Sequence, residues 1–439
     1  MRPSTFKGGI HPFEGKELSK DKPVKVVLPK GELVYPMSQH IGAPARPIVS
    51  VGDTVLVGQI IGEATGFVSA NIVCSVSGIV KAVEKRLTVS GNKDLAIIVK
   101  NDNEYRTADR VGEKRDYTTL SKDEIRKAVK DAGIVGMGGA GFPTHVKLSP
   151  KDDSKIEFVI VNAAECEPYL TSDYRMMLEE TEKLIGGLRV ILRLFEKAQG
   201  IIAIEDNKPE AISRIYELVK DDPRIRLQVL KTKYPQGAER QIIYACTGRQ
   251  INSALLPSDV GCIVNNVDTT ISVYMAVCES TPCIRRIVTV TGDAIKDPRN
   301  FSVRTGTNYR ELAEAAGGFV KQPQKIVSGG PMMGIALFSL DVPVTKTSSA
   351  LLCFSKDEVA WQEPSACIRC GRCVQACPSK LIPQKLLESA ENFDDAGFIK
   401  LNGMECYECG SCTYVCPAKR RLTQAFKQTR RSILDSRKK

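Results

Sequence analysis

The stretches CIRCGRCVQACP, residues 367–378, and CYECGSCTYVCP, residues 406–417, decide how the C-terminal part of the chain folds. Each has three cysteines separated by two residues, a fourth cysteine after three more residues, and then a proline, which is the ligand spacing of bacterial ferredoxins. Three closely spaced thiolates can surround three corners of a cubane, and the fourth reaches the other cluster. The sequence therefore predicts two [4Fe–4S] clusters on Cys367, Cys370, Cys373, Cys377, Cys406, Cys409, Cys412 and Cys416.

Structural zinc is the alternative for these motifs, because paired C-x-x-C spacings also bind zinc. A zinc site needs four ligands in two knuckles, not two identical four-cysteine runs that each end in Cys-Pro. The cluster interpretation is therefore favoured. Because iron–sulfur ligation implies a reducing compartment, we expect the other seven cysteines to be small buried residues rather than disulfides.

The bulk composition is that of a multidomain globular protein, since 439 residues are too many for one hydrophobic core. The net charge of +11 comes without a basic, aromatic-rich segment or zinc-finger spacing, so we expect no nucleic-acid partner. Anionic cofactors and an acidic or membrane-surface partner explain the charge better. No apolar run approaches the roughly 18 to 20 residues that span a bilayer, and no signal peptide is apparent, so we expect only peripheral membrane contact.

At the N-terminus we expect a separate segment at residues 1–22, followed by a small β domain at residues 23–100. The β domain alternates short β-type runs with Gly and Pro turns, beginning with Val24–Leu28. Its phrase VSVGDTVLVGQIIGE, residues 49–63, resembles the barrel-sandwich fold of lipoyl and biotinyl carriers. Ala70–Val73 stands where the carrier lysine would be, so we expect a structural or docking role for this lipoyl-like domain.

Residues 110–283 predict an α/β domain. Ser121–Glu124 is a capping box that begins a helix, and Phe158–Val161 is a short apolar run typical of a buried strand. A long helical pattern follows at about residues 175–195, after which strand and helix patterns alternate.

The C-terminal part predicts a β-grasp-like module at residues 284–350 and a ferredoxin-like domain at residues 360–421. The basic tail at residues 422–439 is expected either to form a helix that docks on a membrane partner or anionic lipid, or to remain a solvated chain end.

A glycine-rich loop, GMGGAG at residues 136–141, satisfies the pattern G-x-G-x-x-G. A Rossmann site needs this pattern after a strand and at the start of a helix, but here it follows a helix and precedes Pro143. The Rossmann interpretation therefore fails. The loops NAAECEP at residues 162–168, YPQGAE at residues 234–239 and VNNVDT at residues 264–269 carry polar groups suited to the strand ends at which open α/β sheets bind ligands.

Together these loops resemble the FMN- and NADH-binding subunit of respiratory complex I, whose flavin fold is not a Rossmann fold. The chain is more similar still to the C subunits of Rnf-type ion-translocating ferredoxin:NAD⁺ oxidoreductases, because FKGGIHP at residues 6–12 and GAGFPTHVKL at residues 139–148 occur in order with the other motifs. The resemblance covers nearly the whole chain. It implies a multidomain α/β protein with a barrel-sandwich domain, a non-Rossmann FMN domain, a β-grasp-like module and a two-cluster ferredoxin-like domain.

The resemblance also implies which residues bind cofactors. Backbone N–H groups of the glycine-rich loop would approach the flavin and the nucleotide, Lys147 would face the FMN phosphate, and Phe142 and Glu167 would contact the nicotinamide nucleotide. The whole set is Gly136, Gly138, Gly139, Phe142, Lys147, Asn162, Glu165, Glu167, Tyr234, Gly237, Glu239, Asn265, Asn266 and Thr269.

The implied function is electron transfer between NAD(H) and two [4Fe–4S] clusters through non-covalent FMN, because a hydride carries two electrons and a cluster accepts one. No catalytic acid or base is required. The chain would be a peripheral subunit, on the cytoplasmic face, of a membrane complex that couples this step to Na⁺ or H⁺ movement. Its partners would be the other subunits.

Two other functions remain open at this point. One is a soluble NADH-dependent flavin/Fe–S reductase of the cobalamin-reductase type. The N-terminal position of the β domain favours the Rnf subunit over this reductase. The other is a non-catalytic electron-transfer adaptor without flavin. Ala164 keeps the adaptor open, because the complex I relative has Asp at this position. Ala238 is a second departure, where that relative has Glu, and it bears on the details of the flavin and nucleotide contacts.

Overall fold

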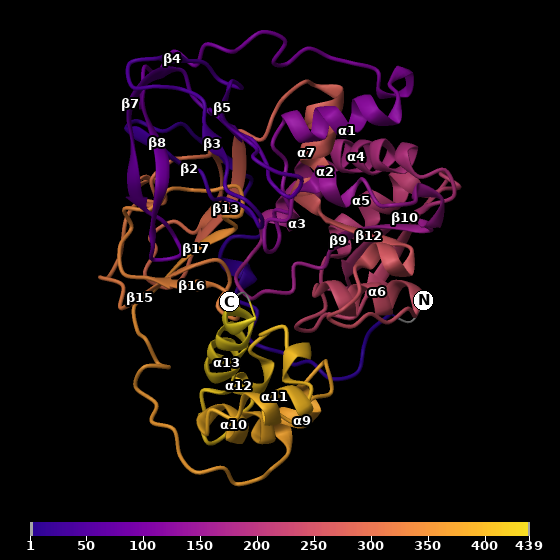
Figure 1. Cartoon of the computed structure of the whole chain (residues 1–439), viewed down its shortest axis with the longest axis vertical. Coiled ribbons are helices and arrows are strands. Elements are labelled where there is room, and N and C mark those ends of the chain that lie inside the picture. The colour runs from indigo at the N-terminus through magenta and orange to yellow at the C-terminus, as the bar shows by residue number, and fades with distance from the viewer. Residues whose placement is uncertain (1–2, 438–439) are drawn as a thin grey trace.

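The computed structural model describes residues 3–437 (Figure 1). The barrel-sandwich and β-grasp units lie on one side of the molecule, the α/β domain on the other side, and the ferredoxin-like domain at one end. Within the described residues, no helix is both long enough and apolar enough to cross a membrane.

The α/β domain is built on a parallel four-stranded sheet with the order β11-β10-β9-β12. Its strands are β9 (Phe158–Ala163), β10 (Gln199–Glu205), β11 (Ile225–Leu230) and β12 (Cys262–Asn266). Helices cover both faces, so the strands are apolar on both sides. Val159 and Val161 of β9 belong to one core, and Ile160 belongs to the other.

The larger core packs against α1 (Lys122–Asp131), α3 (Ser172–Glu179), α4 (Thr181–Leu194), α5 (Pro209–Val219) and α7 (Val267–Cys278), and the smaller one against α6 (Glu239–Thr247). The predicted capping box at the start of α1 is confirmed. The single helix predicted at about residues 175–195 is wrong, because the structure divides it into α3 and α4. The break is at Glu180, whose backbone leaves the helical region and whose carboxylate pairs with Arg285 over 2.7 Å.

The barrel-sandwich domain consists of two small sheets. One has the order β2-β8-β7-β4 and the other β3-β5-β6. Leu33, Ile61 and Ile97 lie in the core between them. The strands are β2 (Glu32–Pro36), β3 (Arg46–Pro47), β4 (Thr54–Val55), β5 (Ile60–Glu63), β6 (Ile72–Val73), β7 (Gly78–Leu87) and β8 (Lys93–Asn101).

The β-grasp-like module is a six-stranded sheet with the order β1-β14-β13-β17-β15-β16, packed on α8 (Tyr309–Ala315). Its strands are β1 (Lys25–Val27), β13 (Arg285–Thr291), β14 (Arg299–Arg304), β15 (Lys325–Ser328), β16 (Ile335–Leu337) and β17 (Ala350–Phe354). The placement of Val24–Leu28 in the β domain is corrected here. Strand β1 pairs with β14 instead, because the open edge of β14 supplies its backbone hydrogen-bond partners.

The ferredoxin-like domain is helical. It contains α9 (Arg372–Ala376), α10 (Pro383–Glu391), α11 (Asp395–Lys400), α12 (Ser411–Tyr414) and α13 (Leu422–Ser436). The region predicted as a basic tail forms α13, which buries Leu422, Phe426 and Ile433 in the core of this domain instead of standing apart from it. Lys438 and Lys439 of that tail lie outside the described residues.

Residues 4–22, which we call the N-terminal strap, cross from the α/β domain to the ferredoxin-like domain and back (Figure 1). The Ser4 N–H donates to the Val229 carbonyl over 3.0 Å, and the Gly9 N–H donates to the Ala376 carbonyl over 2.9 Å. The strap then forms a short 3-10 turn at Lys16–Leu18. It therefore ties the two domains together.

Candidate functional site

The strand order of the parallel sheet reverses beside β9, since β10 and β11 lie on one side of it and β12 returns to the other. Open α/β sheets bind ligands beyond the carboxyl ends of their strands at such a switch point. Asn162 of β9 is paired in register with Asn266, the last residue of β12. The structure thus brings two of the predicted flavin residues to this edge.

The glycine-rich loop lies over the start of α7. The Met137 N–H donates to Thr269 Oγ1 over 2.9 Å, and a Cβ atom at Gly138 would come within 2.8 Å of the Asn266 amide nitrogen. Gly138 must therefore lack a side chain for the loop to approach α7 so closely. A Cβ atom at Gly139 would meet nothing within 4 Å, so this part of the loop borders open space.

The loop closes on itself and leads into α2 (Thr144–Lys147). The Gly136 N–H donates to the carbonyl of the half-buried Phe142 over 2.8 Å. Lys147 Nζ donates to the Val264 carbonyl over 2.7 Å, and burial lowers the pKa of this lysine. Its ammonium group is therefore fixed at the end of β12.

Asn266, Asp173 and Glu165 form a polar network across the same edge. Asn266 Nδ2 donates to Asp173 Oδ2 over 2.7 Å, and Glu165 Oε1 accepts from the Asp173 N–H over 2.7 Å. Burial raises the pKa of both carboxyls, to about 7 for Asp173. Glu165 therefore holds the start of α3 in place beside Asn266.

The loop that begins at Tyr234 faces in two directions. The Gly237 carbonyl accepts from Asn162 Nδ2 over 2.7 Å, whereas the Tyr234 hydroxyl donates to the Cys409 carbonyl of the ferredoxin-like domain over 2.7 Å. Glu239 is exposed at the start of α6 and acts on Lys147 through its charge, which raises the pKa of that lysine against the larger lowering by burial. Tyr234 thus joins the cluster domain to this edge.

Several buried polar atoms at the edge have no hydrogen-bond partner in residues 3–437. Both amide atoms of Asn265, which is 1% exposed, and both of Gln236, which is 0% exposed, are unpartnered. Buried amides are normally paired, so these groups fit the carbonyl and N–H edges of a flavin. Gln236 was not among the predicted ligands, although it lies between Tyr234 and Gly237 in the loop YPQGAE.

Glu167 lies where the α/β domain meets the β-grasp module. Its Oε2 accepts from the Met332 N–H over 3.1 Å, and a Cβ atom at Gly330 would collide with the same oxygen. Oε1 is buried without a partner among the described residues. Burial raises the pKa of this carboxyl to about 7. One oxygen of Glu167 is therefore available to a ligand.

Lys16 of the N-terminal strap holds the loop that carries both glutamates. Its buried ammonium group donates to the carbonyls of Glu165, Glu167 and Leu170 over 2.9, 3.0 and 2.5 Å. Lys208 adds a bond of 2.7 Å to the Ala164 carbonyl. Neither lysine could be predicted from the sequence, because neither lies in a motif.

We predict that Lys16→Met weakens FMN binding and lowers the free energy of unfolding by about 2–3 kcal/mol, since three buried carbonyls lose a charged donor. Thermal unfolding and FMN titration of the flavin-free protein would measure both effects. Lys20→Met, at an exposed position of the same strap, is the matched control. Equal FMN affinity in the two variants would contradict the role of Lys16.

Thiols from both cysteine runs line one cavity: Cys377, Cys406, Cys409 and Cys412. Burial raises the pKa of Cys412 to about 12, and thiolates including Cys377 add to this shift. Burial also raises the pKa of Cys373, with a contribution from Cys416. We call the cavity with its four thiols the inner cluster site, and Cys367, Cys370, Cys373 and Cys416 the outer cluster site. Among residues 3–437, no three Cys, His, Asp or Glu side chains are spaced as ligands of a single metal ion.

We call the edge at the carboxyl ends of the parallel strands, together with the loops described above, the flavin edge. The inner cluster site lies against it. Besides the bond from the Tyr234 hydroxyl, Arg240 pairs with Glu405 over 2.7 Å, and Gln241 Nε2 donates to the Tyr407 hydroxyl over 3.2 Å. In the outer site, by contrast, Cys367 and Cys370 are exposed. The contacts with the flavin edge thus come from the inner site.

We predict that Cys377→Ala alters the cluster held by the second cysteine run, because the fourth cysteine of each run serves the other cluster. Electron paramagnetic resonance of this variant should resemble that of Cys409→Ala, and Cys416→Ala should resemble Cys370→Ala. A spectrum of Cys377→Ala that matches Cys370→Ala would show that each run binds its own cluster.

Family models match most of the chain in the predicted order. They are the RnfC barrel sandwich hybrid domain at residues 4–104, the Nuo51 FMN-binding domain at residues 129–275, the SLBB domain at residues 287–336 and the 4Fe-4S dicluster domain at residues 366–419. These matches define a flavoprotein subunit of the complex I type with an iron–sulfur dicluster domain, and they confirm the predicted fold class.

Two curated relatives are similar over most of their length. The C subunit of the Na⁺-translocating ferredoxin:NAD⁺ oxidoreductase complex of Acetobacterium woodii is 42% identical over all of this chain and 99% of its own. The C subunit of the proton-translocating ferredoxin:NAD⁺ oxidoreductase complex of Clostridium ljungdahlii is 43% identical over 87% of this chain and 83% of its own. The chain belongs to the RnfC family, as its motifs predicted.

A solved structure supports the fold alone. The crystal structure of an NAD⁺-reducing [NiFe]-hydrogenase in the H₂-reduced state matches with a TM-score of 0.50 and 18% identity. The match covers 73% of this chain and 62% of that chain.

Proposed function

We propose that this chain is the peripheral NADH/FMN/Fe–S subunit of a membrane complex that couples electron transfer between ferredoxin and NAD⁺ to Na⁺ or H⁺ transport. The observation that carries the proposal is the hydrogen bond of 2.7 Å between the Tyr234 hydroxyl and the Cys409 carbonyl, which joins the flavin edge to the inner cluster site. The activities in the names of the two relatives support it.

The residues of the flavin edge would bind and orient the cofactor. Asn265 and Gln236 offer unpaired amides, the glycine-rich loop offers backbone N–H groups, and the Lys147 ammonium suits a phosphate. Bound FMN would accept a hydride as two electrons and release them singly. The residues of the flavin edge would position the bound flavin and exclude water from it.

The nucleotide would bind beside the flavin, with Glu167 Oε1 accepting from its ribose or amide and Phe142 stacking on it. Electrons would then use the inner cluster site before the outer one, because within residues 3–437 the described contacts with the flavin edge come from the inner site. The absence of a spanning helix in residues 3–437 agrees with peripheral attachment, and NAD(H) as substrate implies the cytoplasmic face.

Cofactor analysis after anaerobic purification tests the proposal. We expect about one acid-releasable FMN per chain and iron for two [4Fe–4S] clusters, with NADH reducing flavin and clusters in one titration. If FMN fails to bind even after reconstitution, while both clusters are present, the chain is an electron-transfer adaptor without flavin and the proposal fails.

We predict that Glu167→Gln impairs NADH use and leaves FMN and iron content unchanged. The carboxylate that accepts from the nucleotide dominates above its pKa of about 7, so wild-type NADH affinity should fall as the pH drops through 7. The variant should show no such pH dependence, and its loss at pH 8 should be about tenfold, the cost of one hydrogen bond to a charged group. NADH titrations at pH 6 and pH 8 would measure this, and identical profiles would remove Glu167 from the nucleotide site.

A further inference from the structure

We propose that the outer cluster site is a docking surface for an acidic face of a partner subunit, which takes electrons from it or delivers them. The inference rests on the proposed function, because it assumes that the chain works within a complex. The contact is made by the outer cluster site, and the partner presents negative charge to it.

The outer cluster site is more open to solvent than the inner one. Every residue from 361 to 370 is exposed, including Cys367 and Cys370. Ile368, which lies between these two ligands, is 68% exposed, and Trp361 is 79% exposed. An exposed isoleucine between two cluster ligands, with an exposed tryptophan six residues before the first of them in sequence, is typical of the apolar part of a protein interface.

The two stretches that carry the outer ligands have only positive charges. The stretches 365–377 and 416–427 contain no Asp or Glu, but they contain a group of cations that we call the basic rim: Arg369, Arg372, Lys419, Arg420 and Arg421. Within residues 3–437, Arg420 is the only member of the basic rim that forms an ion pair, with Glu391 over 2.7 Å. The other four charges face no acidic partner in the described chain.

The inner cluster site shows that such a rim is not needed to hold a cluster. Its second cysteine run, residues 406–412, contains one charged residue, Glu408, which pairs with Arg430. If the cations served only to offset the negative charge of a cluster, the more buried inner site would need them more, because charge is less screened there. The basic rim therefore points outward, to an acidic partner.

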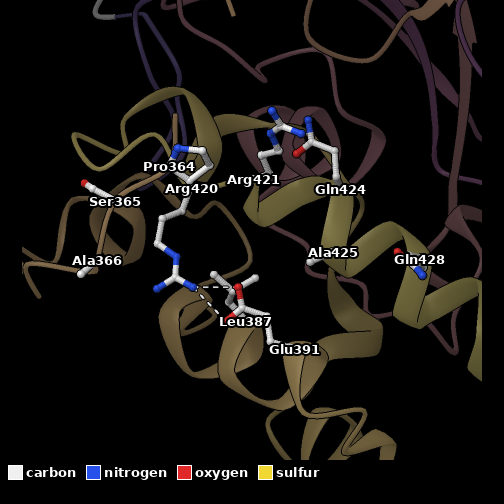
Figure 2. Close-up of a pocket in the computed structure, with 10 residues that line it drawn as sticks. All are labelled: Pro364, Ser365, Ala366, Leu387, Glu391, Arg420, Arg421, Gln424, Ala425 and Gln428. Carbon is white, nitrogen blue, oxygen red and sulfur yellow. Dashed lines mark hydrogen bonds and ion pairs between the residues drawn. The ribbon is translucent and has the colours of Figure 1, made fainter. Parts of the chain in front are cut away.

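A groove beside the outer site provides a shape for this contact (Figure 2). Pro364, Ser365 and Ala366, which lead into the first cysteine, form one side. Arg421, which precedes α13, and Gln424 and Gln428 of α13 form the other. Leu387 and Ala425 contribute apolar surface, and the Arg420–Glu391 pair lies between the two sides. An extended or helical acidic segment would find cations, amide donors and an apolar contact here.

Rebinding to membranes that carry the complex without this chain tests the surface. We expect the double variant Arg369→Glu/Arg372→Glu to rebind about tenfold more weakly at low salt, and to lose most of the salt dependence seen with wild type. Trp361→Ala should weaken rebinding without changing the salt dependence, because it removes area and no charge. Sedimentation at several KCl concentrations gives both quantities.

The matched control is Lys385→Glu/Lys400→Glu. It makes the same change in charge at two exposed positions of the same domain that do not line the groove. Control and wild type should rebind alike. FMN content, iron content and NADH oxidation by a soluble dye, measured on each isolated variant, would reveal a failure of the proposed function separately from a failure of docking.

A zero-length carboxyl-to-amine crosslinker identifies the occupant, because Lys419 is an exposed amine in the basic rim. We expect Lys419 to join a carboxylate of another subunit, and Lys419→Arg to abolish that product while it keeps the charge. Unchanged rebinding of both test variants would overturn the proposal. So would equal binding of wild type to protein-free anionic vesicles, which would assign the surface to lipid, or release by excess soluble ferredoxin, which would assign it to a diffusing carrier.

Discussion

The flavin edge depends on one buried cation. Lys16 donates to three carbonyls of the loop after β9, and without that donor the loop would bury unpaired oxygens beside two carboxylates, Glu165 and Glu167. A buried charge is tolerated only when it is fully hydrogen-bonded, so the loop and the N-terminal strap must form together. The strap also contacts the ferredoxin-like domain, so the same constraint fixes the inner cluster site relative to the flavin edge.

Three units meet at Glu167. The β-grasp module supplies the Met332 N–H, the α/β domain supplies the carboxylate, and Tyr234 beside it reaches the carbonyl of Cys409. Met332, Tyr234 and Cys409 belong to one small apolar cluster. A site at such a junction is rigid only when all three units are packed. The flavin edge and the inner cluster site are thus parts of one structure.

Much of the fold follows from local patterns. The capping box at Ser121, the buried strands and the cysteine runs are each set by residues close together in sequence, so the sequence predicts them. Lys16 contacts carbonyls about 150 positions away, as the sequence separations of its bonds show. Gln236 is recognisable only by its unpaired amide. The partner of β1 and the docked face of α13 likewise depend on tertiary packing, which no local pattern contains.

The excess of positive charge in the chain is divided between two environments. Lys16, Lys208 and Lys346 are buried, and each donates to backbone carbonyls, so their charge acts inside the protein. The cations of the basic rim are at the surface, where their field extends about a Debye length, roughly 8–10 Å, into solution. The buried lysines stabilise the loops whose carbonyls they hold, whereas surface cations attract anionic groups that approach. The net charge of +11 is therefore divided between lysines that hold loops together inside the protein and surface cations that, in the proposed docking, attract an acidic partner.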